Sequence, residues 1–405
     1  MIVLCRIWTR STEPDGKLAS KMEHTAGSKV LSNDMEEDIY RGLDIVTLLN
    51  AGPFLHESNV GGAETSRMSK KLKFKKGDEV QGLELFLSHT WRSSSILKYV
   101  LLCFMFNAEY ALFVVYASIF PFTLLGWFLQ SNGITLPSYN TPIYGGAMTM
   151  TLFVTLGSGV CGTLAFFFGH MLPGRDLGTK YVFLDKCCIE QVDVEKKLRG
   201  IAALGGFLHY SKGLAVLWDR DYFERLWCVY ELAARVHVVG VSDTRPLTFH
   251  SLHEACFATL GFFVCVAYGP LSYAVMTINE WSGLVDPSLL STLTGQLVMW
   301  TLYGSPAFWI PKYTCCHMTV NTFIEMKDAI QNFKVENTKV TSEADRPVVE
   351  NSIKAWFGSL ANFNQKIRIN LWESLEGKVG NGVMPPCARS ACEEFRTHAA
   401  LSTHT

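Results

Sequence analysis

Apolar and polar residues follow two repeating patterns in the segment 181–234. Residues 181–184 and 213–218 are short apolar runs, each followed by an aspartate, and uninterrupted runs of this length are typical of strands buried on both faces. After each run, apolar residues recur every three to four positions, which indicates one amphipathic helix in each place. The alternation predicts a strand–helix–strand–helix unit of a parallel α/β sheet.

Further runs extend this unit at both ends. Residues 83–91 (LELFLSHTW) are predicted to form its first strand, and residues 92–106 the crossover helix that follows. Residues 245–249 are a candidate fourth strand, and no pattern elsewhere indicates a fifth. Because parallel strands require only a long crossover, the sheet is assigned to two separated pieces of the chain, residues 83–106 and 175–252.

Four long segments without a charged residue interrupt and follow the α/β pattern. A hydrophobic content of 48% and a positive mean hydropathy are also high for a soluble protein. Because about 20 apolar residues in a helix span a hydrocarbon core of ~30 Å, each segment is predicted to be a transmembrane helix rather than a buried helix of a large soluble protein. The segments are residues 110–129, 147–172, 255–278 and 289–310, in two hairpins at 107–174 and 253–312.

Basic residues predict how these helices are oriented. The connectors 130–146 and 279–288 contain no Lys or Arg, whereas basic residues flank the opposite ends of the apolar segments. Loops rich in Lys and Arg remain on the cytoplasmic side of a membrane. We therefore predict a multi-pass membrane protein with both termini and the α/β domain in the cytosol. The lipid bilayer is thus its first predicted partner.

The N-terminal region, residues 1–82, carries no strong period and is predicted to be basic and largely disordered. Residues 35–49 are the exception and are expected to form one amphipathic helix. The basic run 66–76 has two interpretations, a solvated linker or a contact with an anionic leaflet.

The C-terminal part of the chain, residues 313–376, is predicted to be a cytosolic helical segment. From residue 348 onward, apolar residues recur every three to four positions, as in one long amphipathic helix or a helical pair. The apolar face packs on the α/β unit or lies at the membrane surface, and core packing is the favoured interpretation. Residues 377–405 are predicted to be a disordered tail.

Several kinds of site are not predicted. The cysteines lack the CxxC spacing of zinc sites, so no metal site is assigned. The sequence contains no GxxxxGK[ST] phosphate loop, and the segment GSGVCG in the second apolar stretch suits close helix packing instead. A net charge of −1 provides no field that would attract nucleic acid.

An ordered set of residues resembles the Toll and interleukin receptor type (TIR) domain family. In that family a strand ends in aspartate, Arg-Gly precedes an apolar helix, and Trp-Cys-x-x-Glu-Leu lies on the helix after the next strand. The matching residues here are Asp185, Arg199, Gly200, Ser211, the LAVLW strand, Tyr222, Trp227, Cys228, Glu231 and Leu232. The run LELFLSHTW is similar to the family's first strand. Most TIR domains lack membrane segments between their first two strands, so this chain departs from the family there.

The resemblance implies a flavodoxin-like sheet and two alternative functions. Some TIR domains cleave nicotinamide from NAD with a glutamate at the position matched by Glu231, and a carboxylate there stabilises an oxocarbenium-like state. On this hypothesis NAD is a substrate and no cofactor is required. Other TIR domains only self-associate and recruit partners, in which case the loop 187–199 is a docking surface and Glu231 a structural helix residue. NAD cleavage is the favoured hypothesis, and homo-oligomerisation suits both.

The candidate binding residues lie at the predicted carboxyl ends of the strands, where ligands bind in open α/β sheets. Aromatic side chains at this edge are suited to stack on the base or on the nicotinamide. The candidates are Ser88, Trp91, Trp218, Asp219, Tyr222 and Trp227, with Glu231 as the catalytic carboxylate.

Overall fold

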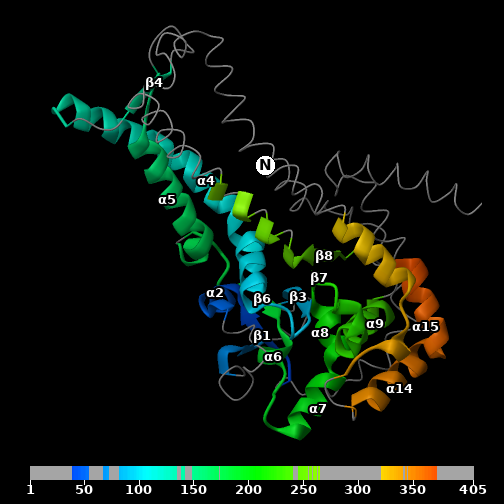
Figure 1. The fold of residues 1–405 in the computed structure, drawn as a ribbon. Coiled ribbons are helices and arrows are strands. Elements are labelled where there is room, and N and C mark those ends of the chain that lie inside the picture. Colours follow the sequence, from blue (N-terminus) through cyan, green and yellow to red (C-terminus); the bar gives the residue numbers. More distant parts are fainter. Residues whose placement is uncertain are drawn as a thin grey trace, which may run out of the picture. The chain divides into compact units, whose positions relative to one another are not determined.

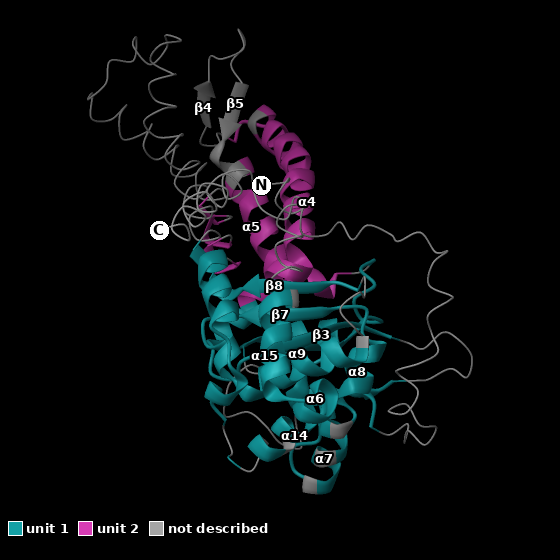
Figure 2. Cartoon of the chain, turned by 90° about the vertical axis from the view of Figure 1, so that its right-hand side faces the viewer, with its two compact units in different colours: residues 1–99, 174–253, 319–405 teal, residues 100–173, 254–318 magenta. Residues whose placement is uncertain are grey.

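A computed structural model describes residues 39–53, 67–72, 82–134, 138–141, 148–172, 174–239, most of 245–264, 321–340 and most of 343–371. The chain divides into two compact units (Figure 2). Unit 1 comprises residues 1–99, 174–253 and 319–405, and unit 2 comprises residues 100–173 and 254–318. Each unit is therefore assembled from separated pieces of the chain, as the sequence predicts for the sheet.

Unit 1 contains a six-stranded, mostly parallel sheet (Figure 1). Its strands, in spatial order, are β2 (Lys70–Lys71), β1 (Arg41–Asp44), β6 (Tyr181–Phe183), β3 (Leu83–His89), β7 (Leu214–Trp218) and β8 (Leu247–Ser251). The last four are parallel, whereas β1 is antiparallel to both of its neighbours. Numbered along the chain, the four parallel strands stand in the order 2-1-3-4, so the first predicted strand lies between the second and the third.

The pairing of the central strands joins the two pieces of chain that flank residues 100–173. Phe86 of β3 pairs with Leu214 of β7, and Ser88 pairs with Val216. Every residue of β7 is buried, as expected for an uninterrupted apolar run. On the other side of β3, the rings of Phe86 and Phe183 stack with their centroids 4.2 Å apart. The central sheet is thus confirmed as one hydrophobic core made from both pieces.

The described part of the N-terminal region contains a strand that the sequence analysis does not predict. Residues 41–44 form β1 and are followed by the short helix α2 (Ile45–Asn50), so the single helix expected over residues 35–49 is wrong. The Asp44 side chain accepts a hydrogen bond from the Thr47 backbone N–H at 2.8 Å, which caps α2 and ends the strand. Leu43 is fully buried, and pairing with β6 fixes the extended conformation of the segment.

The helices of unit 1 follow the strands closely. They are α6 (Asp185–Cys188), α7 (Val194–Ala202), α8 (Leu204–Tyr210), the 3₁₀ turn η5 (Tyr222–Glu224) and α9 (Leu226–Val239). Three helices, α6, α7 and α8, thus lie between β6 and β7, where the sequence predicts one. Asp193 caps α7 by accepting hydrogen bonds from two backbone N–H groups, and α8 restarts the chain in a new direction after Ala203.

The C-terminal segment is a helical pair that packs within unit 1, as the favoured interpretation predicts. Helix α14 (Asp345–Phe357) is followed by α15 (Leu360–Lys366) and a π-helical turn, η8 (Ile367–Leu371). Several of the apolar residues that the sequence pattern marks are buried, among them Ile353 and Phe363 at 0% exposure, whereas Ile369 is 46% exposed. The Trp356 ring of α14 stacks on the Tyr230 ring of α9 with the centroids 5.4 Å apart.

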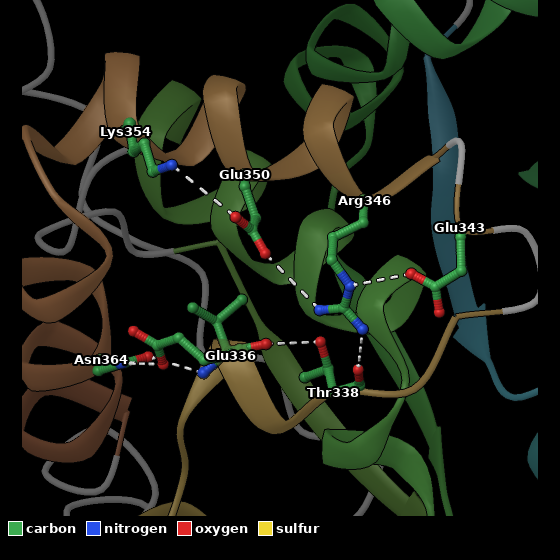
Figure 3. A network of polar contacts seen from close by, with 8 residues as sticks. Glu336, Thr338, Glu343, Arg346, Glu350, Lys354 and Asn364 are labelled. Carbon is green, nitrogen blue, oxygen red and sulfur yellow. Dashed lines mark hydrogen bonds and ion pairs between the residues drawn. The ribbon is translucent and has the colours of Figure 1, made fainter.

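A polar network fixes the chain between η7 (Val335–Asn337) and α14 (Figure 3). Arg346 donates a hydrogen bond to the Thr338 carbonyl at 2.7 Å and forms ion pairs with Glu343 and Glu350. Asn364 of α15 accepts a hydrogen bond from the Val335 N–H at 2.9 Å. These contacts determine the path of the residues that reach the start of α9, described below.

One described helix, which begins in unit 1 and continues from residue 100 in unit 2, is long and apolar enough to cross a membrane. Helix α4 (Ser95–Ser131) continues through Pro121 and merges the predicted crossover helix with the predicted span 110–129. The predicted span 147–172 is wrong as one helix, because it begins as strand β5 (Met148–Thr151), which pairs with β4 (Ser138–Thr141), and becomes helical only in α5 (Leu152–Phe168). The spans 255–278 and 289–310 lie mostly outside the described residues. Within the described ranges the structure shows one helix of membrane-spanning length, not four.

Helices α4 and α5 are in close contact, as the small residues of GSGVCG predict. A Cβ at Gly157 of α5 would lie 2.6 Å from the Phe122 ring of α4, so only glycine permits this approach. Buried Asn107 of α4 donates a hydrogen bond to the Phe166 carbonyl at 3.0 Å and lies 3.2 Å from His170 Nδ1. Many large side chains along α4 are nevertheless exposed, including Phe120 and Trp127, each at 69%.

Candidate functional site

A serine, a tyrosine and a glutamate meet at the carboxyl end of the parallel sheet. The Ser88 hydroxyl of β3 donates a hydrogen bond to Glu231 Oε2 of α9 at 2.5 Å. The same hydroxyl lies 2.7 Å from the Tyr222 hydroxyl of η5. All three side chains are buried, and Glu231 is 7% exposed. The structure thus brings together three of the predicted site residues, which come from both pieces of the sheet.

Local sequence explains this convergence. Alternation along β3 turns Ser88 to one face of the sheet while its backbone pairs with β7. After β7 the chain turns through η5, and α9 then returns along the sheet with Glu231 one turn beyond Trp227. Cys228 directly follows Trp227 in α9. Its sulfur lies 3.4 Å from the His89 carbonyl oxygen, and this contact holds α9 against the end of β3.

The environment of Glu231 favours its neutral form. Desolvation, followed by the nearby Asp185 carboxylate, raises the pKa of Glu231 well above its usual range, and the hydrogen bond from Ser88 opposes this shift. Burial likewise raises the pKa of Tyr222 and of the Cys228 thiol. The surroundings of the cluster therefore favour a neutral carboxyl, phenol and thiol over the corresponding anions.

A second polar group surrounds Trp91, at the end of β3 next to β6. The Trp91 indole N–H donates a hydrogen bond to Asp185 Oδ2 at 2.6 Å, and its ring lies over the Lys186 ammonium, with 4.6 Å between Nζ and the ring centroid. Trp91 is 38% exposed, whereas Lys186 is fully buried. This tryptophan is thus a partly exposed cover over a buried cation.

A third polar group lies between the ends of β3 and β7. Thr90 Oγ1 is 2.7 Å from Asp219 Oδ2, and burial raises the pKa of Asp219. The opposite oxygen, Asp219 Oδ1, is buried and has no hydrogen-bond partner among the described residues. Lys98, in the first turn of α4, is fully buried, and its Nζ also lacks such a partner in the part of the chain that is described.

The two remaining predicted residues lie elsewhere. Trp218, the last residue of β7, is buried at 2% exposure. Trp227 forms an edge contact with Tyr230, with the centroids 5.5 Å apart, and so belongs to the layer between α9 and α14. Of the predicted aromatic residues at the strand ends, Trp91 is the exposed one.

The C-terminal segment holds the start of α9 in place. The Lys339 backbone N–H donates to the Glu224 carbonyl at 2.6 Å, and the Leu226 N–H donates to the Lys339 carbonyl at 3.1 Å. This strand-like pairing joins the turn that leads to Glu231 to the network around Arg346. The C-terminal helices therefore contribute to the geometry of the site although they contribute none of its predicted residues.

Sequence reasoning missed Lys98, Lys186, Asp185 and Thr90 as members of the site. Asp185 and Lys186 follow the end of β6 directly, so the rule that ligands bind beyond strand ends applies to them as well. No comparable signal marks Lys98. Among the residues that the structure describes, no three His, Cys, Asp or Glu side chains are grouped as metal ligands would be.

Comparison with known proteins identifies no relative, since no family model, curated protein or solved structure matches this chain.

Proposed function

We propose that unit 1 is a TIR-like domain that hydrolyses NAD at the bond between nicotinamide and ribose, and that α4 anchors it in a membrane. The observation that carries the proposal is the contact of Glu231 with Ser88 at the carboxyl end of the sheet. The strand order 2-1-3-4 of the parallel strands supports a flavodoxin-like sheet of the TIR type.

The chemistry of NAD suits a buried carboxyl at this edge. Water adds to the anomeric carbon of the ribose, nicotinamide leaves as a neutral molecule, and the products are ADP-ribose, nicotinamide and one proton. The transition state carries positive charge on the ribose, which a carboxylate stabilises. Because the nicotinamide ring of NAD is itself a cation, substrate binding favours loss of the Glu231 proton, and the Ser88 hydrogen bond favours the same form.

One observation favours the alternative, a signalling module without catalysis. Glu231 is 7% exposed and its carboxyl is satisfied by Ser88, which also suits a structural role. The loop 187–199 offers a docking surface in this case, because Val192 is 64% exposed and the first turn of α7 presents charged side chains to solvent. Exposed apolar residues of this kind suit self-association.

Nicotinamide release by the detergent-purified full chain tests the proposal. Glu231→Gln keeps the size of the side chain and removes the carboxylate, so release is expected to fall by at least about a hundredfold. Glu84→Gln, at the amino end of β3 where Glu84 pairs with exposed Lys212, is the matched control and should leave the rate unchanged. Equal release by wild type and Glu231→Gln would reject the assignment.

The alternative requires a second measurement because many TIR enzymes act only when assembled. Rates and self-association are therefore measured together over a range of protein concentrations. An absence of nicotinamide release from assembled protein, with assembly lost in Val192→Asp, would favour the signalling module.

A further inference from the structure

Two lysines and two aspartates lie together at the carboxyl ends of β3, β6 and β7, beside the Glu231 site. Lys98 interacts electrostatically with Asp185, Asp219 and Lys186. Both lysines have side chains at 0% exposure. Ammonium groups are strongly hydrated, so burial of two of them is costly. The carboxyls of Asp185 and Asp219 offset this cost only in part, because burial raises the pKa of both.

In this group one lysine donor and one aspartate acceptor lack a hydrogen-bond partner among the described residues. Lys98 Nζ is a buried donor and Asp219 Oδ1 is a buried acceptor. Neither atom has a hydrogen-bond partner within the described ranges. The other Asp219 oxygen is already occupied by Thr90, so the side chain is held in place with its free oxygen fixed. Buried polar atoms are paired in most proteins, and exceptions often mark positions that a ligand completes.

The two atoms without a partner indicate the chemistry of the ligand. Lys98 suits an anion with several oxygen acceptors, which the neighbouring charge of Lys186 also attracts, and Asp219 suits a hydroxyl donor close to that anion. A ribose that carries a phosphate or diphosphate provides both. Trp91 contacts both Asp185 and Lys186 and is 38% exposed, so its ring is the part of this group that solvent reaches.

We propose that Lys98 and Lys186 bind the diphosphate of a ribose-containing nucleotide, and that Asp219 Oδ1 accepts a hydrogen bond from a hydroxyl of the adjoining ribose. This subsite deepens the proposed function and rests on it for the identity of the nucleotide. It places the diphosphate beside Trp91 and leaves the scissile ribose to Glu231.

Binding of ADP-ribose and of inorganic pyrophosphate to the full chain in detergent tests this subsite without any turnover. Lys98→Met keeps the length of the side chain and removes the ammonium, and affinity for both probes is expected to fall by about tenfold or more. Lys212→Met is the matched control, because Lys212 is exposed and pairs with Glu84 on the surface. Unchanged affinity of Lys98→Met for both probes would overturn the proposal.

Asp219→Asn distinguishes binding of the ribose hydroxyl from binding of the diphosphate. Thr90 holds the oxygen of the new amide, so its NH₂ replaces the free acceptor with a donor. Affinity for ADP-ribose should fall about tenfold, whereas pyrophosphate, which has no hydroxyl group to donate, should bind at least as tightly as to wild type. Equal weakening of both probes would contradict the assigned role of Asp219.

Thermal unfolding without ligand distinguishes binding from structure. Since Lys98 Nζ donates no hydrogen bond in the described structure, Lys98→Met should melt at the same temperature as wild type or higher. A lower melting temperature with unchanged affinity would make Lys98 a structural residue and reject the subsite.

Two further controls separate this inference from related possibilities. Glu231→Gln should still bind ADP-ribose, so Lys98-dependent binding without hydrolysis would retain the subsite and reject the proposed reaction. Vesicles that contain phosphatidic acid supply a phosphate on a lipid, and Lys98-dependent binding to these vesicles, with none to ADP-ribose, would reject the nucleotide.

Discussion

At the scale of single residues, the charge of Glu231 depends on two opposing effects. Burial raises its pKa, and the hydrogen bond from Ser88 lowers it. A catalytic carboxylate needs the second effect to prevail when substrate is bound, whereas the free protein is more stable with the proton in place. Stability and activity are therefore expected to respond to pH in opposite directions.

Replacement of Glu231 by glutamine should stabilise the protein at neutral and alkaline pH. An unfolded glutamate loses its proton above about pH 4.3, whereas the folded one keeps it to a higher pH. Between those two pKa values the folded state binds the extra proton, so wild-type stability falls as pH rises. Glu231→Gln should gain about 1–3 kcal/mol at pH 8 and little at pH 4. Melting curves at both pH values measure this, and an equal shift at both would contradict it.

Loss of the Ser88 hydroxyl should change the pH dependence of catalysis. Ser88→Ala removes a donor that favours the carboxylate, so the pKa of Glu231 rises further. Nicotinamide release at pH 7 is expected to fall by about tenfold and to recover as the pH is raised. Ser94→Ala, an exposed serine at the start of α4, is the control. A loss of activity that is equal at all pH values would show that Ser88 acts by another route.

At the scale of elements, the packing of the segment before β1 depends on a glycine in helix α8. Tyr40, just before β1, is buried against α8, where its ring lies 4.9 Å from that of Phe207. A Cβ at Gly206 would lie 2.0 Å from the Tyr40 hydroxyl. The two glycines at the start of α8 thus weaken the helix locally, and one of them admits the N-terminal segment into the core.

Gly206→Ala should destabilise the protein although alanine is the better helix former. The gain in helix propensity is about 1 kcal/mol, while displacement of buried Tyr40 costs about 1–3 kcal/mol as in an overpacked core. We expect a lower melting temperature and faster proteolysis before β1. Gly178→Ala is the control, because its Cβ would meet only Val46 at 3.9 Å. A more stable Gly206→Ala protein would mean that Tyr40 moves aside freely.

At the scale of the whole molecule, the sequence predicts the parallel strands well and the edges poorly. The runs that form β6 and β7 are continuous and apolar, which predicts strands buried on both faces, and β3 is apolar apart from Glu84, Ser88 and His89. Strands β1 and β2 have four and two residues, and pairing with a neighbour, which no local pattern encodes, determines them. The sequence predicts two helices in place of α4, because Asn107 and Glu109 interrupt the apolar run. Neither residue ends a helix, so the two predicted helices are continuous.

The candidate site was predictable to the same extent. Ser88, Tyr222 and Glu231 follow from their places after strands and on the next helix, because the carboxyl ends of parallel strands meet at one edge. Buried Lys98 was not foreseen, since a lysine in an amphipathic helix is exposed by default. The four predicted spans had one source, hydropathy, which does not distinguish a continuous helix from a strand followed by a helix, as in β5 and α5.

The proposed position of α4 in a membrane leads to a prediction about sidedness. Exposed apolar side chains along α4, among them Phe120 and Trp127, require a nonaqueous environment, and basic residues precede its apolar part. Asn132, exposed just beyond α4, should therefore lie outside, and Lys212 of the sheet domain in the cytosol. In sealed cells, an impermeant thiol reagent should label Asn132→Cys at once and Lys212→Cys only after permeabilisation, with wild type as background. If both variants were labelled from the same side, α4 would not cross the bilayer, and its apolar surface would instead be buried against another protein.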